Sequence, residues 1–191
     1  MYMGKEYLSK LKADLLELLK AKALKRGRFV LSSGKVSSYY LDGRITTLTP
    51  KGAYLIADII LETLKDRKID AIGGPTIGAD PIVGAIACLS HIKSLPLQTF
   101  IVRKSVKGHG MQKQIEGPPL RKGSRVILVD DVATTGGALI EAKEALEKIG
   151  IKAKEAIVVV DRLQGAASNL KKAGMRLESI FKIRDLGVRQ V

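Results

Sequence analysis

The sequence predicts an α/β fold, a parallel sheet of about five strands flanked by helices with a small N-terminal hood. Two observations lead to this prediction. From residue 69 onward, short apolar segments of strand length alternate with helical segments, and Gly-rich turns follow the apolar segments. Such alternation is typical of a parallel sheet covered on both faces. The 191 residues suffice for one such domain, with residues 1–68 forming helices and hood and residues 69–191 the core.

The N-terminal third contains helix and hairpin signals. Leucines recur at helical spacing across residues 7–25, which predicts an amphipathic helix. Residues 29–41 form two strand-like segments around a Ser/Gly turn. Thr49 and Pro50 are suited to begin a helix over residues 51–65, because threonine caps a helix N-terminus and proline fits its first turn.

The core elements follow in order along the rest of the chain. The expected strands are 69–73, 99–102, 126–130 and 156–161, and the expected helices between them are 79–89 and 138–149. Ligands of parallel α/β sheets bind beyond the carboxyl ends of the strands. The residues that follow each strand are therefore the first candidates for a functional site.

Composition narrows the classes of partner. The formal net charge of +14 would attract polyanions, but the chain has no Trp, and no basic run is interleaved with aromatic residues that could stack on bases, so we expect no nucleic-acid partner. No apolar run approaches the roughly 18 residues of a membrane span. The first 30 residues resemble no targeting signal, so we expect a cytoplasmic protein. The single cysteine, Cys88, is expected to be a small core residue.

The segment from Val126 to Ala142 carries the strongest functional signal. An apolar strand ends in Asp130 and Asp131, and a Thr/Gly loop then leads into a helix. Glycines, hydroxyls and the helix N-terminus together can hold a monophosphate. The loop residues of this cradle are Val132, Ala133, Thr134, Thr135, Gly136, Gly137 and Ala138. Carboxylates repel phosphate, so the two aspartates indicate ribose hydroxyls or a hard cation reached through water.

Other phosphate-binding motifs do not fit this segment. A Walker loop requires a lysine directly after its second glycine, and none follows Gly137. The dinucleotide-binding pattern G-x-G-x-x-G is absent from the chain. The cradle is therefore predicted to bind a single phosphate carried by a sugar.

Residues 103–114 form a basic segment without an acid, and it includes Arg103, Lys104, Lys107 and His109. Glycines flank His109, so we expect a loop that closes over an anion. Positive charge in a closed site would stabilise charge that develops on a leaving group. The alternative interpretation is a solvated run of charge.

The segment Val126 to Ala142 resembles the phosphoribosyl pyrophosphate (PRPP) signature of the type I phosphoribosyltransferases. Four further segments are similar to the orotate phosphoribosyltransferases: Phe29 to Arg44, Gly73 to Ile82, Phe100 to Gly117 and Val158 to Ala166. The resemblance runs in order through nearly the whole chain. It implies transfer of 5-phosphoribose from PRPP to N1 of orotate, which gives orotidine 5'-phosphate and pyrophosphate in pyrimidine biosynthesis.

The resemblance also implies roles for individual residues. Catalytic residues would be Arg103, Lys107, His109, Asp130 and Asp131, and PRPP would contact these together with Lys104 and residues 132–138. Orotate would contact Thr134, Arg162, Tyr40 and Leu41. Mg²⁺ would be held mainly by PRPP and water, with no direct protein ligand. A homodimer is implied, in which the basic loop of one subunit reaches the site of its neighbour.

Several alternatives stay open on the sequence alone. Many relatives carry lysine where this chain has Ser32 and a Tyr-Lys pair where it has Ile77 and Gly78, so backbone N–H groups of residues 76–79 could form an anion nest instead. Tyr39 and Tyr40 fit either a half-buried strand pair or a wall against the base. The chain could also be another purine or pyrimidine phosphoribosyltransferase, or a PRPP-sensing regulator that binds nucleic acid.

Overall fold

The computed structural model describes residues 2–30, 36–95, 97–104 and 114–188. The helices are α1 (Tyr2–Leu18), the π-helical segment η1 (Leu19–Ala23), α2 (Arg44–Thr47), α3 (Pro50–Leu64), α4 (Asp80–Ile92), α5 (Gly137–Glu147), α6 (Ala166–Lys172) and the 3-10 segment η2 (Ile183–Leu186). The strands are β1 (Leu24–Val30), β2 (Val36–Leu41), β3 (Ala71–Pro75), β4 (Gln98–Val102), β5 (Ile115–Glu116), β6 (Val126–Ala133), β7 (Ala153–Asp161) and β8 (Arg176–Lys182).

The main sheet has the strand order β5-β4-β3-β6-β7-β8. Strands β4, β3, β6, β7 and β8 are parallel, and only the two-residue β5 runs antiparallel at the edge. This arrangement confirms the predicted fold class. The chain moves outward from β3 to β4 and then crosses back to place β6 on the other side of β3, so the strand order reverses between β3 and β6.

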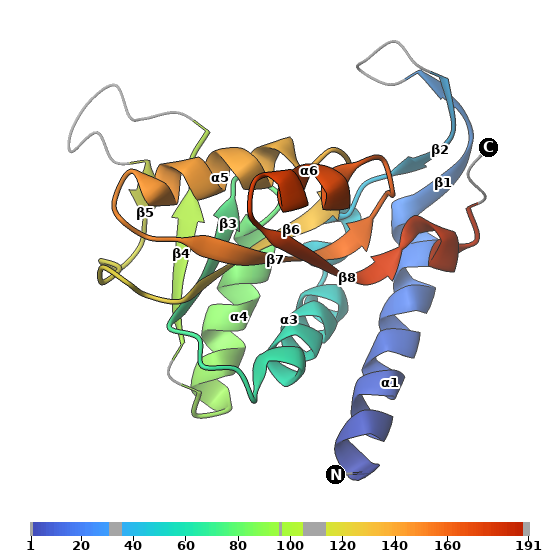
Figure 1. Cartoon of the computed structure of the whole chain (residues 1–191). Helices are drawn as coiled ribbons and strands as arrows, with labels where there is room; N and C mark the ends of the chain where they lie inside the picture. The colour runs from blue at the N-terminus through green and yellow to red at the C-terminus, as the bar shows by residue number, and fades with distance from the viewer. Residues whose placement is uncertain (1, 31–35, 96, 105–113, 189–191) are drawn as a thin grey trace.

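Helices cover both faces of this sheet (Figure 1). Helices α1, α3 and α4 pack on one face, against residues that include Ile127 and Val129 of β6. Helices α5 and α6 pack on the other face, against Val126 and Leu128 of the same strand. Successive strand residues point to opposite faces, and both faces of β6 are apolar, so the strand is buried from both sides.

The helices and the strands of the N-terminal third lie in two different parts of the molecule. Helices α1 and α3 belong to the sheet-covering layer, and α3 begins as predicted, with Thr49 Oγ1 accepting a hydrogen bond from the Gly52 N–H at 3.1 Å. Strands β1 and β2 form a separate antiparallel hairpin, which projects beyond the sheet (Figure 1). Among the described residues, no helix is long and apolar enough to cross a membrane.

The structure corrects four expectations. Strand β6 continues to Ala133, so Asp130 and Asp131 lie within the strand rather than at its end. Strand β8 and helix α6 were not predicted, because β8 is an edge strand rich in charged residues and α6 is only seven residues long. The first helix changes to π-helical geometry at residue 19. Cys88 is exposed on α4 instead of lying in the core.

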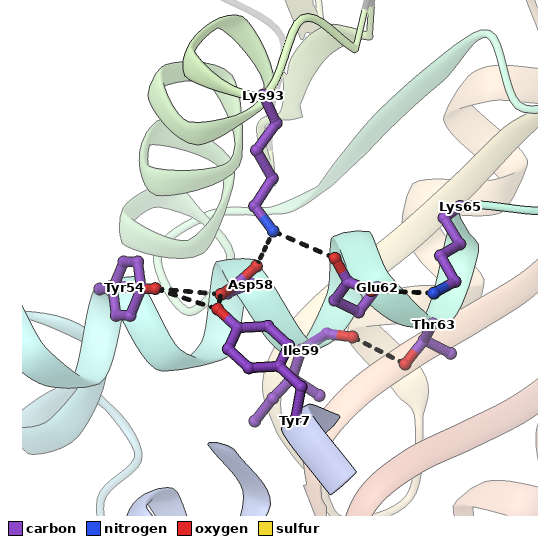
Figure 2. Close-up of polar contacts among 8 residues, drawn as sticks. All are labelled: Tyr7, Tyr54, Asp58, Ile59, Glu62, Thr63, Lys65 and Lys93. Carbon is purple, nitrogen blue, oxygen red and sulfur yellow. Dashed lines mark hydrogen bonds and ion pairs between the residues drawn. The ribbon is translucent and has the colours of Figure 1, made fainter. Parts of the chain in front are cut away.

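A polar network joins three helices on one side of the sheet (Figure 2). The buried carboxylate of Asp58 on α3 accepts hydrogen bonds from Tyr7 Oη on α1 at 2.5 Å and from Tyr54 Oη at 3.1 Å. Lys93, which directly follows α4, forms ion pairs with Asp58 and Glu62. Burial by itself would raise the pKa of Asp58, but the hydrogen bonds from Lys93 and Tyr7 outweigh it and hold the pKa below its ordinary value.

Replacing Asp58 with asparagine is expected to lower the free energy of unfolding by about 1–3 kcal/mol at pH 7, because the buried network loses its negative charge and one of the two oxygens that accept hydrogen bonds. A carboxyl group whose pKa is lowered by folding stabilises the native state above its unfolded pKa, near ~3.9. That contribution is lost as the pH falls through the lowered value. Denaturant unfolding at pH 7 and pH 3 measures both effects.

The control is Asp66→Asn, which removes the same charge from an exposed position just after α3. It should change stability little at either pH. A loss for Asp58→Asn that is as large at pH 3 as at pH 7 would contradict the electrostatic explanation and leave only a packing effect.

Candidate active site

The candidate site lies where the strand order reverses, at the carboxyl ends of β3 and β6. Open parallel sheets bind ligands at this crevice, because the loops of the two neighbouring strands separate there to opposite faces. The loop after β3 brings Gly78 to the two aspartates of β6. Residues that are far apart in sequence thus meet at one point.

The phosphate cradle predicted from the sequence is a hollow of about 210 Å³ at the end of β6. Its lining consists of Asp130, Val132, Ala133, Thr134, Thr135, Gly136, Gly137, Ala138 and Leu139. Gly136 has φ of 83°, a left-handed conformation that favours glycine, and it directly precedes α5. The Asn169 side chain donates a hydrogen bond to the Thr135 carbonyl at 3.0 Å and so holds the loop from the opposite side.

Residues 134–138, which form the loop after β6 and the start of α5, line this hollow. No residue in the described part of the chain accepts a hydrogen bond from their backbone N–H groups. Amide donors at a helix N-terminus attract anions through their partial positive charge. The loop can therefore surround a phosphate with amides and with the hydroxyls of Thr134 and Thr135.

Asp130 and Asp131 are adjacent, half-buried carboxyl groups. Burial raises the pKa of Asp130 well above its ordinary value, and repulsion by Asp131 adds to this shift. Burial also raises the pKa of Asp131, although the Val132 N–H, a hydrogen bond with Asp130 and the charge of Arg44 act in the opposite direction. Two crowded acceptors of this kind suit hydroxyl donors or a nearby cation.

Two glycines pack directly against these carboxyl groups. A Cβ atom on Gly78 would lie 2.3 Å from Asp130 Oδ1 and 2.5 Å from Asp131 Oδ1, and one on Gly43 would lie 2.7 Å from Asp131 Oδ2. Arg44, next to Gly43, is held by Asp42 through contacts of 2.9 and 3.0 Å. The segment after β2 thus closes over the acidic pair.

If this site binds PRPP, as the sequence resemblance implies, Gly78→Ala is expected to lower kcat/KM for PRPP about tenfold, because the new methyl group forces the two carboxylates out of position. The matched control is Gly84→Ala on α4, where an added Cβ meets no atom within 4 Å. Steady-state kinetics and thermal unfolding of both variants test this expectation. Equal activities in the two variants would show that the carboxylates adjust without consequence.

Arg162 directly follows β7 at the same edge of the sheet. Its backbone N–H donates to the Ala133 carbonyl at 2.9 Å, and its Nε donates to Tyr39 Oη at 3.1 Å. The guanidinium carbon lies 5.0 Å from the centre of the Tyr39 ring, a cation–π contact. The Asp161 carboxylate accepts from the Leu163 N–H at 2.8 Å, which fixes the turn that carries Arg162.

The two tyrosines of β2 have different surroundings. Tyr39 is buried and orients Arg162, while Tyr40 is 39% exposed and its ring lies 5.8 Å from that of Phe29. Leu41 is buried in the core. Thus Tyr39 positions a site residue from within the core, and Tyr40 is the tyrosine left accessible to a ligand.

The basic segment is described only at its two ends, where the Arg103 N–H donates to the Gln114 carbonyl at 2.8 Å. Arg103 and Lys104 directly follow β4, and Arg103 Nη1 lies 3.5 Å from Glu116 Oε1 on β5. Three of the positions discussed from the sequence lie outside the described residues: Ser32, Lys107 and His109. The roles assigned to them stay predictions.

The anion nest expected over residues 76–79 is wrong for two of its four donors. The Thr76 N–H donates to the Val102 carbonyl at 3.0 Å, and the Ala79 N–H donates to the Pro75 carbonyl at 3.2 Å. These bonds join β3 to β4 and begin α4, so only the amides of Ile77 and Gly78 are left for a ligand. Gly78 is better explained by its approach to Asp130.

Sequence reasoning missed three contributors to the site: Tyr39 as the partner of Arg162, and Gly43 and Arg44 beside Asp131. All three come from the segment Phe29 to Arg44, whose resemblance to a known family was the available signal. Periodicity could not have found them, because their partners lie on β6 and after β7.

Comparison with known proteins agrees with this arrangement. A family model described as a phosphoribosyl transferase domain matches residues 45–188. An orotate phosphoribosyltransferase of Rhodopirellula baltica is 42% identical over 182 residues, covering 92% of this chain and 94% of the relative.

Solved structures give the same result. The orotate phosphoribosyltransferase of Mycobacterium tuberculosis in complex with Fe(III) dicitrate superposes with a TM-score of 0.81 at 38% identity, covering 93% of this chain and 99% of the other. The M. tuberculosis enzyme in complex with PRPP has a TM-score of 0.77 at 34% identity, with the same coverage.

The parallel sheet, the cradle after β6 and the matching family model define a type I phosphoribosyltransferase. The relatives that match over most of their length share one base specificity in their names. The chain belongs to the orotate phosphoribosyltransferase family.

Proposed function

We propose that this enzyme transfers the 5-phosphoribosyl group of PRPP to N1 of orotate, giving orotidine 5'-phosphate and pyrophosphate. In this step N1 loses its proton and forms a bond to ribose C1, while the bond from C1 to the pyrophosphate oxygen breaks and its electron pair leaves with pyrophosphate. The observation that carries the proposal is the juxtaposition of a monophosphate cradle, an acidic pair and Arg162 at one sheet edge.

Each part of the site has a distinct task in this reaction. The amides and hydroxyls of residues 134–138 hold the 5-phosphate, and Asp130 and Asp131 accept hydrogen bonds from the ribose hydroxyls. Thr134 and Arg162 bind orotate, with the guanidinium on its carboxylate, and the strand segment at Tyr40 and Leu41 borders the base. Since the sugar becomes cation-like as the bond breaks, nearby carboxylates favour the transition state.

A divalent cation, which we propose to be Mg²⁺, fits this acceptor set. PRPP and water would hold it, and Asp130 and Asp131 would accept hydrogen bonds from its waters. The cation supplies charge neutralisation for the pyrophosphate. Its nearby positive charge would also oppose the burial that raises the pKa of both aspartates and the repulsion by Asp131 that adds to the shift at Asp130.

We further propose that Arg103, Lys104, Lys107 and His109 neutralise the leaving pyrophosphate, with the basic segment of one subunit serving its neighbour in a homodimer. Support comes from the basic, acid-free sequence and from the position of Arg103 and Lys104 directly after β4. We place the enzyme in the cytoplasm, because PRPP and the nucleotide product are highly charged and do not cross membranes unaided.

Lys107→Ala is expected to lower kcat at least 100-fold while the orotate KM changes little, since the lost charge acts on the leaving group in the transition state. Single-turnover and steady-state rates measure the effect, and thermal unfolding checks the fold. Unchanged turnover would remove Lys107 from the mechanism. If mixing Lys107→Ala with an Asp131→Asn variant restores activity, the loop acts across subunits.

The function itself is tested by following orotate absorbance with PRPP and Mg²⁺, beside adenine, hypoxanthine and uracil as alternative acceptors. Turnover with orotate that disappears on chelation of the metal is the expected result. Reaction with another base would keep the PRPP site and refute the role of Arg162. Binding of PRPP without reaction of any base would favour a PRPP-sensing regulator.

A further inference from the structure

A second concave site lies at the opposite edge of the sheet from the catalytic one. It is a groove of about 590 Å³ formed by the segments that lead into β3, β6 and β7. We call it the amino-edge groove and define it by Lys68, Ile69, Lys122, Val126, Lys152 and Lys154. Strand β6 begins in this groove and ends at the phosphate cradle about 23 Å away, because each strand residue advances by ~3.3 Å.

The groove is strongly basic. Of the described residues that line it, six are lysine or arginine and only Glu155 is acidic. Glu155 is already neutralised, because Arg67 and Arg176 contact it at 2.9 and 2.8 Å. Arg125 is likewise paired, with Asp70.

Four lysines are left after these pairings: Lys68, Lys122, Lys152 and Lys154. None of them forms an ion pair with a residue that the structure describes. All four side chains are exposed. Like charges gathered around a hollow repel one another, and a multiply charged anion placed between them would relieve that repulsion.

The shape and floor of the groove indicate the class of anion. Its volume is in the range of sites for small molecules, about 300–1,000 Å³. Ile69, Val126 and Ile127 form an apolar part of the wall, and no aromatic residue among those that the structure describes lines it. A strand of nucleic acid would lack a surface on which its bases could stack. A compact ligand with its charge concentrated in one chain fits better.

We propose that the amino-edge groove binds an oligophosphate, meaning a chain of at least two phosphates, either free or attached to a small metabolite. The lysines contact the phosphate oxygens, and the apolar wall accommodates the uncharged part of the ligand when one is present. The proposal does not depend on the reaction at the other edge of the sheet. It assigns this chain a second ligand site with its own recognition chemistry.

The test is isothermal titration of inorganic triphosphate and of ATP into the full chain at 150 mM salt. The groove variant carries Lys122→Gln, Lys152→Gln and Lys154→Gln. The control variant carries Lys10→Gln, Lys20→Gln and Lys22→Gln, which removes the same charge from exposed positions on α1 and η1 that do not line the groove. Orotate turnover in both variants verifies that the catalytic edge is intact.

We expect the groove variant to bind triphosphate at least tenfold more weakly than the wild type, and the control variant to change less than twofold. Equal affinity for ATP and triphosphate would identify the phosphate chain as the recognised group. Tighter binding of ATP than of triphosphate would indicate that the nucleoside part also contacts the apolar wall. Equal weakening in both variants would mean general charge attraction, and unchanged binding in the groove variant would place the anion in the catalytic cradle. Either of the last two results overturns the proposal.

Discussion

Asp130→Asn is expected to lower kcat/KM about 100-fold and at the same time to increase the free energy of unfolding by about 0.5–2 kcal/mol. Activity falls because a neutral amide is a weaker acceptor for ribose hydroxyls and cannot offset the positive charge of the reacting sugar. Stability rises because the buried charge and its repulsion from Asp131 are removed. The amide oxygen can still accept the hydrogen bond from the Asp131 N–H, now 2.9 Å from Asp130 Oδ1.

The effect of Asp130 on the free energy of unfolding changes with pH in a defined direction. Folding raises the pKa of Asp130, so the native state binds more protons than the unfolded state between the unfolded and folded values. The contribution of Asp130 to native stability is therefore greatest below its unfolded pKa of ~3.9. This contribution declines as the pH rises through the raised pKa that Asp130 has in the folded state. Denaturant unfolding from pH 4 to pH 8 should show the difference between variant and wild type growing with pH.

Asp42→Asn is the contrasting variant. The side-chain hydrogen bond with Arg44 lowers the pKa of Asp42, so this replacement should bring no gain in stability at neutral pH. A gain of the same size in both variants would mean that any loss of negative charge stabilises the protein. That result would contradict a specific conflict between Asp130 and Asp131.

Arg162→Ala is expected to raise the KM for orotate at least 100-fold while the KM for PRPP changes less than threefold. A bidentate guanidinium–carboxylate contact is worth several kcal/mol when it is partly shielded from water, and alanine removes all of it. Steady-state kinetics with each substrate varied in turn separates the two constants. Equal losses for orotate and PRPP would contradict the assignment of Arg162 to the base.

Tyr39→Phe provides a graded companion to this variant. It removes the hydroxyl that accepts from Arg162 Nε but keeps the ring beneath the guanidinium. The KM for orotate should rise about 3–10-fold, in keeping with the loss of one neutral acceptor. An effect as large as that of Arg162→Ala would mean that the hydroxyl itself contacts the base.

Much of the fold and half of the site could be predicted from local sequence. Four core strands and the cradle are visible because apolar runs, turn glycines and paired acids are all local signals. Strand β8 was missed because its residues alternate weakly between charged and apolar at the sheet edge. The approach of Gly43 and Gly78 to the acids could not be predicted, since it depends on how three separate loops pack.

The pairing of β3 with β6 has a kinetic consequence. Gly78 and Asp130 are distant in sequence, so the acidic site exists only after the chain has closed a long loop and crossed back over β3. Parallel pairings of this kind form slowly, because the entropy of loop closure is lost before any contact compensates for it. During refolding, the helical signal in far-UV circular dichroism should therefore recover before enzymatic activity. Activity returns late because it requires the complete strand order of the native sheet.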